Sequence, residues 1–135
     1  MKEACRDAFS PPQTGQAKRP LDVLVVDPEA SDLVFVERFL TARGHAVVNA
    51  GSGEIALRLA SQTSFDAVLC DARLLGRDGT PIAAALRSSD GCLDARFVLS
   101  AVDPEDAKAP VSVEGAAFVA RPYDVEELRR LIEGE

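Results

Sequence analysis

Residues 65–71 have the sequence FDAVLCD, and this stretch decides how the rest of the chain is interpreted. Its unbroken apolar run, residues 67–70, has the length and composition typical of a strand buried on both faces. Asp71 follows directly, and the chain then enters a loop that contains Gly76 and Gly79. We therefore expect Asp71 to be rigidly held at the end of a buried strand and exposed there.

Segments of two kinds alternate along the chain around this strand. Short apolar runs typical of strands lie at 21–26, 45–49, 65–70, 95–99 and 117–120. Apolar residues at helical spacing occupy 31–43, 52–61, 80–88 and 124–133. Such alternation predicts an α/β fold with a five-stranded parallel sheet and helices on both faces.

Local signals mark several ends of these helices. Gly44 stands where the first helix is expected to stop. Thr80 followed by Pro81 predicts a helix cap and a proline at the first helical position. Asp124 and Glu127 have the spacing of a capping box at the start of the last helix.

The crossover at 102–115 is the least regular part of the predicted domain. It contains Pro104 and Pro110, and a proline inside a helix removes a backbone hydrogen bond. We therefore expect the fourth helix to be short or irregular, covering residues 104–109.

The composition limits the location and the class of partner. The N-terminus lacks the layout of a secretory signal and no run is long enough to span a membrane, so we expect a cytoplasmic protein. A formal net charge of -7 disfavours direct binding of nucleic acid, because that affinity comes mainly from Lys and Arg. The polar, proline-containing residues 1–20 are expected to be a flexible tail or linker, and residues 21–135 the folded domain.

Polar side chains follow the first, third, fourth and fifth predicted strands. They are Asp27, Asp71, Ser100 and Arg121. Ligands gather at the carboxyl ends of the strands in open parallel sheets, so these side chains are expected to meet. A carboxylate there can accept a phosphoryl group, which requires a nearby cation and precise positioning. Asp27 and Asp71 could together hold Mg²⁺.

Taken together, these segments resemble the receiver domains of two-component signalling, a flavodoxin-like (βα)5 family. The matching segments are 23–27 (VLVVD), 51–57 (GSGEIAL), 66–71 (DAVLCD), 78–79 (DG), 98–101 (VLSA) and 115–123 (GAAFVARPY). The resemblance implies that Asp71 accepts a phosphoryl group from a histidine kinase or phosphotransfer protein. It implies no enzymatic activity beyond self-phosphorylation and autodephosphorylation.

The resemblance also implies roles for other residues. Asp27 matches the first of two acids that position Mg²⁺, and Arg73 matches the residue whose backbone carbonyl completes the metal shell. Ser100 matches the hydroxyl that moves toward the phosphate, and Phe118 matches the aromatic whose rotamer follows that movement. Pro122 matches a proline that usually follows a cis peptide bond.

Two positions in the expected pocket depart from the family pattern. Pro28 stands where the family has a second acid, so Mg²⁺ binding is expected to be weak or absent unless Glu29 substitutes. Arg121 stands where the family has lysine, and the two cations are not interchangeable. Arginine can instead pair with Asp71 or Asp27 and neutralise the pocket without a metal.

Three functions remain open from the sequence. The first is a working phosphoacceptor whose face around the fourth helix, fifth strand and fifth helix changes shape or dimerises. The second is a degenerate receiver that binds a protein or a nucleotide without phosphorylation. The third is an independent enzyme on the same fold, for which the sequence has no glycine-rich phosphate loop and no Ser-His-Asp arrangement.

Overall fold

The computed structural model describes residues 17, 19–103, 113 and 115–134. Its strands are β1 (Asp22–Val26), β2 (Ala46–Ala50), β3 (Ala67–Asp71), β4 (Arg96–Ala101) and β5 (Ala117–Ala120). Its helices are α2 (Ala30–Ala42), α3 (Gly53–Ala60), α4 (Ile82–Arg87), the 3-10 turn η1 (Asp90–Cys92) and α5 (Val125–Glu133). In this part of the chain, no helix has both the length and the apolar character that a membrane crossing requires.

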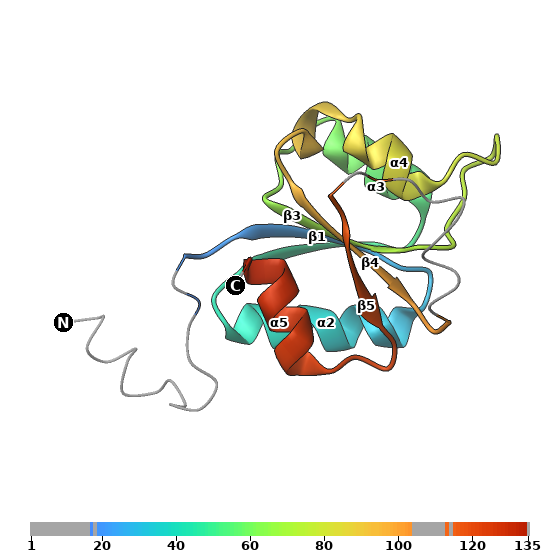
Figure 1. Cartoon of the computed structure of the whole chain (residues 1–135). Helices are drawn as coiled ribbons and strands as arrows, with labels where there is room; N and C mark the ends of the chain where they lie inside the picture. The colour runs from blue at the N-terminus through green and yellow to red at the C-terminus, as the bar shows by residue number, and fades with distance from the viewer. Residues whose placement is uncertain (1–16, 18, 104–112, 114, 135) are drawn as a thin grey trace, which may run out of the picture.

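The strands form one parallel sheet in the order β2-β1-β3-β4-β5. Helices α3 and α4 cover one face of this sheet, and α2 and α5 cover the other (Figure 1). The predicted α/β fold is therefore confirmed. The order places β3 at the centre, between β1 and β4, so the end of β3 lies beside the ends of both neighbours.

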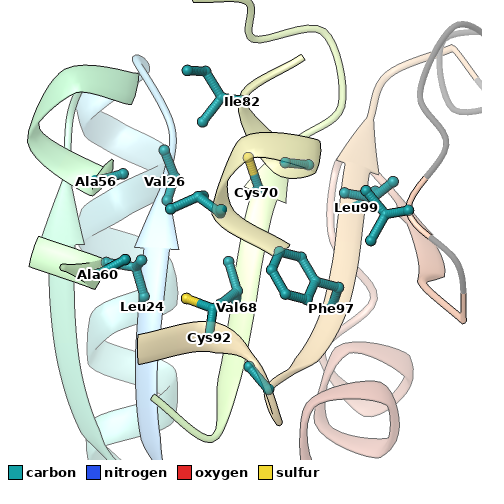
Figure 2. Close-up of a cluster of buried hydrophobic side chains, with 14 of the residues drawn as sticks. Leu24, Val26, Ala56, Ala60, Val68, Cys70, Ile82, Cys92, Phe97 and Leu99 are labelled. Atoms are coloured by element: carbon teal, nitrogen blue, oxygen red, sulfur yellow. The ribbon is translucent and has the colours of Figure 1, made fainter. Parts of the chain in front are cut away.

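Two hydrophobic clusters, one on each face, hold the helices to the sheet. Figure 2 shows the larger cluster, in which side chains of β1, β3 and β4 meet those of α3 and α4. Strand β1 contributes to both clusters, because Leu24 and Val26 point to one face and Val23 and Val25 to the other. Burial on both faces explains why this strand is a continuous apolar run in the sequence.

Several local expectations can be compared with the structure. Gly44 follows the end of α2 with a φ of 99°, as the stop signal predicts. Asp124 caps α5 by accepting the backbone N–H groups of Glu126 and Glu127. The expected cap at Thr80 is wrong, because α4 begins one residue later and Pro81 occupies the cap position. Residues 1–16, 18 and 104–109, which include most of the expected tail and all of the expected short helix, lie outside the described residues.

A buried polar network ties the ends of α2 and α5 to the amino edge of the sheet. His45 Nδ1 accepts the backbone N–H of Leu21 at 3.0 Å, and His45 Nε2 lies 2.9 Å from Glu133 Oε2. Arg43 donates to both carboxylate oxygens of Glu133. Burial alone raises the pKa of Glu133, but the hydrogen bonds from Arg43 and His45 outweigh it and lower that pKa. The ionised carboxylate therefore stabilises the fold.

Replacing Glu133 by glutamine is expected to lower the free energy of unfolding by about 1–3 kcal/mol at neutral pH, because buried donors lose a charged acceptor. A carboxyl with a lowered pKa stabilises the fold above the pKa of the unfolded chain. That contribution is lost as the pH falls through the folded value, so the difference between the two proteins should shrink in acid. Urea denaturation across this pH range measures it.

Glu54→Gln is the matched control. Glu54 pairs with Arg77 in an exposed ion pair away from Glu133, and such pairs contribute less than about 1 kcal/mol. An equal loss of stability in the two variants would contradict a special role for the buried network.

Candidate functional site

The carboxyl edge of the sheet gathers the four side chains that the sequence singles out. Asp27 directly follows β1, Asp71 is the last residue of β3, and Arg121 directly follows β5. Ser100 lies in β4 in register with Asp71. The parallel strand order thus brings residues that are far apart in the chain together in one site.

Arg121 lies between three carboxylates at this edge. Its Nη1 donates to Asp27 Oδ2 at 2.8 Å and to Asp32 Oδ2 at 3.3 Å. Its Nη2 donates to Asp71 Oδ2 at 3.3 Å. We refer to Arg121 with Asp27, Asp32 and Asp71 as the arginine clamp. The guanidinium bridges acids from three different segments, where the sequence predicted a pair with Asp71 or Asp27 alone.

The clamp buries the acceptor candidate. Asp71 is 5% exposed and Asp27 is 3% exposed, so the expectation of an exposed Asp71 is wrong. The reason is that the side chain of Arg121, itself 8% exposed, packs against both carboxylates. A cavity of about 420 Å³ borders Asp27, Asp71 and Arg121 and connects them to the surface. Asp71 therefore lines an open cavity although little of its own surface is free.

Backbone groups hold the second oxygen of each buried acid. The N–H of Glu29 donates to Asp27 Oδ1 at 2.9 Å, and the N–H of Arg73 donates to Asp71 Oδ1 at 2.9 Å. Each carboxylate thus presents one oxygen to the backbone and the other to Arg121. This pairing orients both acids and leaves neither oxygen without a donor.

The residues expected to hold Mg²⁺ do not fit the ion in this arrangement. Mg²⁺ needs near-octahedral oxygen ligation at about 2.0–2.1 Å. The Arg121 guanidinium already donates to Oδ2 of both Asp27 and Asp71, so its positive charge opposes a second cation between these acids. Pro28 has no side-chain ligand to add. Within the described residues, no group of three His, Cys, Asp or Glu side chains is placed to hold a metal.

The other two residues suggested for the metal shell lie at the rim of the cavity. Glu29 is exposed and accepts a hydrogen bond from Ser31 Oγ. Arg73 is exposed beside the same cavity, and the hydrogen bond described for it comes from its backbone N–H. The substitution of Glu29 for the missing acid and the metal-shell role of the Arg73 carbonyl stay predictions.

Asp32 is a site residue that the sequence reasoning missed. It lies in the first turn of α2, five residues after Asp27, and its side chain is 34% exposed. The signal was available, because a helix that directly follows β1 directs its first turn toward the carboxyl edge of the sheet. An acid in that turn is therefore a candidate for any site at this edge.

Desolvation dominates the electrostatics of the site. Burial raises the pKa of Asp27, with smaller raising effects from Asp32 and Asp71, although the Glu29 N–H and Arg121 lower it. Burial would lower the pKa of Arg121, but Asp71 and Asp27 outweigh this and raise it. The guanidinium is therefore held in its charged form among an excess of acids.

Further polar and aromatic groups surround the clamp. Ser100 Oγ and Arg121 Nε are buried and have no hydrogen-bond partner of normal geometry among the described residues. Burial raises the pKa of Tyr123 to about 12, although the nearby Ser100 hydroxyl and Arg121 charge lower it. The Tyr123 ring stacks on Phe35 of α2 at a centroid distance of 6.2 Å. The phenol therefore stays protonated beside the site.

The remaining residues named by the resemblance take ordinary positions around this edge. Phe118 lies half-buried in β5 and packs against the larger hydrophobic cluster. The peptide bond between Arg121 and Pro122 is cis, as the resemblance implies.

A five-stranded parallel sheet with helices on both faces, which presents acids, a hydroxyl and a cation at its carboxyl edge, defines a receiver-type signalling domain. The chain belongs to the response regulator receiver domain family, whose model matches residues 23–133. Its curated relatives include the transcriptional regulatory protein ZraR of Escherichia coli, with 26% identity over 84% of this chain. The transcriptional regulatory protein PrrA of Mycobacterium leprae is 30% identical over 78% of this chain. The matched regions span only 26% and 46% of these two relatives.

Solved receiver structures share the fold. The receiver domain of sensor histidine kinase PA1611 from Pseudomonas aeruginosa superposes with a TM-score of 0.70 at 19% identity, covering 87% of this chain and all of that one. That structure was solved with a magnesium ion in its active-site cleft. A receiver protein from Pseudomonas putida gives a TM-score of 0.71 at 24% identity, covering 88% of this chain and 99% of that one.

Asp27→Asn is expected to raise the free energy of unfolding by about 1 kcal/mol at neutral pH. A carboxyl with a raised pKa in the folded protein loses folding free energy when it ionises. The asparagine removes that cost, keeps an acceptor for the Glu29 N–H, and leaves two acids for Arg121. The gain should be complete above the folded pKa and should vanish as the pH falls below the ordinary value of 3.8.

Chemical denaturation as a function of pH measures this difference, and Asp94→Asn serves as the control because Asp94 is exposed and distant from the clamp. A loss of stability in Asp27→Asn at neutral pH would show that the Arg121 pair outweighs the burial of the charge.

Proposed function

We propose that this receiver domain accepts a phosphoryl group on Asp71 from the phosphohistidine of a histidine kinase or phosphotransfer protein. The observation that carries the proposal is the convergence of Asp71, Ser100 and Arg121 at one end of the sheet, beside a cavity of about 420 Å³. Family membership supplies the class of reaction. The geometry supports the choice of this carboxylate over the other acids of the chain.

The proposed step uses Asp71, Arg73 and Arg121 of this chain and the phosphohistidine of the donor protein. One oxygen of Asp71 attacks the phosphorus, a P–O bond forms as the P–N bond to the donor histidine breaks, and the histidine nitrogen keeps the electron pair and takes a proton from solvent. Asp71 Oδ1 is oriented by the Arg73 N–H, while Oδ2 faces Arg121. Arg121 supplies the cation that the developing negative charge needs.

Ser100 is proposed to donate to the new phosphoryl group. Its Oγ is buried in register with Asp71 and has no other partner of normal geometry in the described structure. Phe118 is proposed to change rotamer with this movement and so to alter the face around β5 and α5. That face is the proposed surface for protein partners, including a second copy of the chain.

The assignment is tested with the purified protein and a small phosphodonor, acetyl phosphate, with and without MgCl2. The chain should gain the mass of one phosphoryl group, and Asp71→Asn should not. The control is Asp78→Asn, which removes an exposed acid in the following loop and should leave the mass gain intact. No mass gain in the unmodified protein, or an equal gain in Asp71→Asn, would contradict the proposal.

A degenerate receiver is the second candidate, and the arginine clamp favours it. A cation held by three carboxylates neutralises part of the acidic pocket before any phosphoryl group arrives. Such a domain would bind its protein or nucleotide partner in one fixed conformation. In cells, an Asp71→Asn variant should then signal like the unmodified protein, whereas a working phosphoacceptor should lose its signal.

A further inference from the structure

We infer that Arg121 is the resident cation of this pocket, that it competes with a divalent metal for the same carboxylate oxygens, and that Asp32 is the residue that positions it there. This inference concerns the site proposed above for phosphorylation. It depends on the contacts of the resting pocket, so its test needs no phosphodonor and can succeed or fail independently of phosphoryl transfer.

The competition follows from which oxygens Arg121 uses. It takes Oδ2 of Asp27 and Oδ2 of Asp71, while Oδ1 of each acid is held by a backbone N–H. A metal ion that bridged the two acids would need at least one oxygen from each. The Arg121 guanidinium donates to Oδ2 of both acids and places its positive charge between them, so a bridging metal ion and the clamp compete for this position.

The shape of the guanidinium makes this arrangement possible. Nη1 reaches Asp27 and Asp32 while Nη2 reaches Asp71, so one side chain donates to three separate acids. A lysine ammonium is a compact point charge on a flexible stem, and it does not reproduce a planar donor fork. The change from the family's lysine to Arg121 therefore alters which contacts are made while the charge stays the same.

Asp32 is a positioning residue in this scheme. It approaches the same Nη1 that binds Asp27, from the first turn of α2. This contact ties the guanidinium to a third element, so that rotation away from Asp71 breaks an additional ion pair. Asp32 itself is partly exposed, and we expect its effect to act through Arg121.

The arrangement is incomplete, which is why it can be displaced. The buried Nε of Arg121 has no acceptor within the described structure, and an unpaired buried donor carries a desolvation cost. Three carboxylates also face a single cation, so the pocket retains an excess of negative charge. A metal ion can therefore enter once the bridging contacts are weakened.

The central experiment compares the Mg²⁺ affinity of the unmodified protein with that of Arg121→Lys, by calorimetry and by chemical shifts of the Asp71 and Arg73 amides. The variant keeps the charge and loses the bridge, so its Kd for Mg²⁺ should fall by roughly tenfold or more. Arg77→Lys is the matched control, because Arg77 is 88% exposed and pairs with Glu54 outside the clamp. Its Mg²⁺ affinity should equal that of the unmodified protein.

Asp32→Asn tests the positioning role through a double-mutant cycle. Removing an acid changes metal binding by electrostatics alone, and the cycle separates this effect from the coupling. If Asp32 acts through Arg121, the gain in Mg²⁺ affinity from Arg121→Lys should be several-fold smaller in the Asp32→Asn background. Equal gains in the two backgrounds would overturn the role of Asp32.

Equal Mg²⁺ affinity in the unmodified protein and in Arg121→Lys would overturn the competition, and so would a failure of Arg121→Lys to bind Mg²⁺ at millimolar concentration. Thermal denaturation establishes that each variant is folded. If the lysine variant does not fold, Arg121→Gln replaces it in the comparison. This variant removes both the bridge and the charge, and it should bind Mg²⁺ more tightly than the unmodified protein.

Discussion

The ion pairs between Arg121 and three carboxylates are the interaction on which the functional end of this molecule depends. Asp27 and Asp71 are almost fully removed from water, and isolated buried charges of one sign are costly. One guanidinium reduces that cost by contacting both acids together with Asp32. The clamp therefore decides how much of Asp71 is exposed and which oxygens remain for any other cation.

The strand order makes this interaction possible. Asp27 follows β1, Asp71 ends β3 and Arg121 follows β5, and helices lie between these strands along the chain. Pairing β3 between β1 and β4, with β5 on the outside, places their carboxyl ends on a single edge. The hydrophobic clusters on both faces fix the strands. Residues that take no part in the chemistry therefore hold the polar groups at this edge in place.

The sequence predicted the sheet and the convergence of Asp27, Asp71, Ser100 and Arg121, because unbroken apolar runs and strand-end polar residues are local signals. It did not predict the burial of Asp71, which arises from a side chain fifty residues away in the chain. It also missed Asp32, whose role depends on the direction of the first turn of α2. The burial of Asp71 follows from the packed structure, whereas Asp32 could have been found from its place in the first helical turn after β1.

Charged groups are arranged in opposite ways at the two ends of the sheet. At the amino edge, the carboxylate of Glu133 meets Arg43, Arg129 and His45, and its pKa is lowered. At the carboxyl edge, Arg121 meets three carboxylates, and the pKa of Asp27 is raised.

Several donors around one acid stabilise the fold, because both oxygens of the buried Glu133 carboxylate are hydrogen-bonded. A surplus of acids around one cation leaves the pocket with excess negative charge. The pocket can therefore bind a further cation, or its carboxylates can exchange Arg121 for another cation. Functional sites commonly carry such a cost while other parts of the fold compensate for it. The placement of several donors around one acid at the amino edge, and of several acids around one cation at the carboxyl edge, is therefore the physical reason to assign stability to the first and switching to the second.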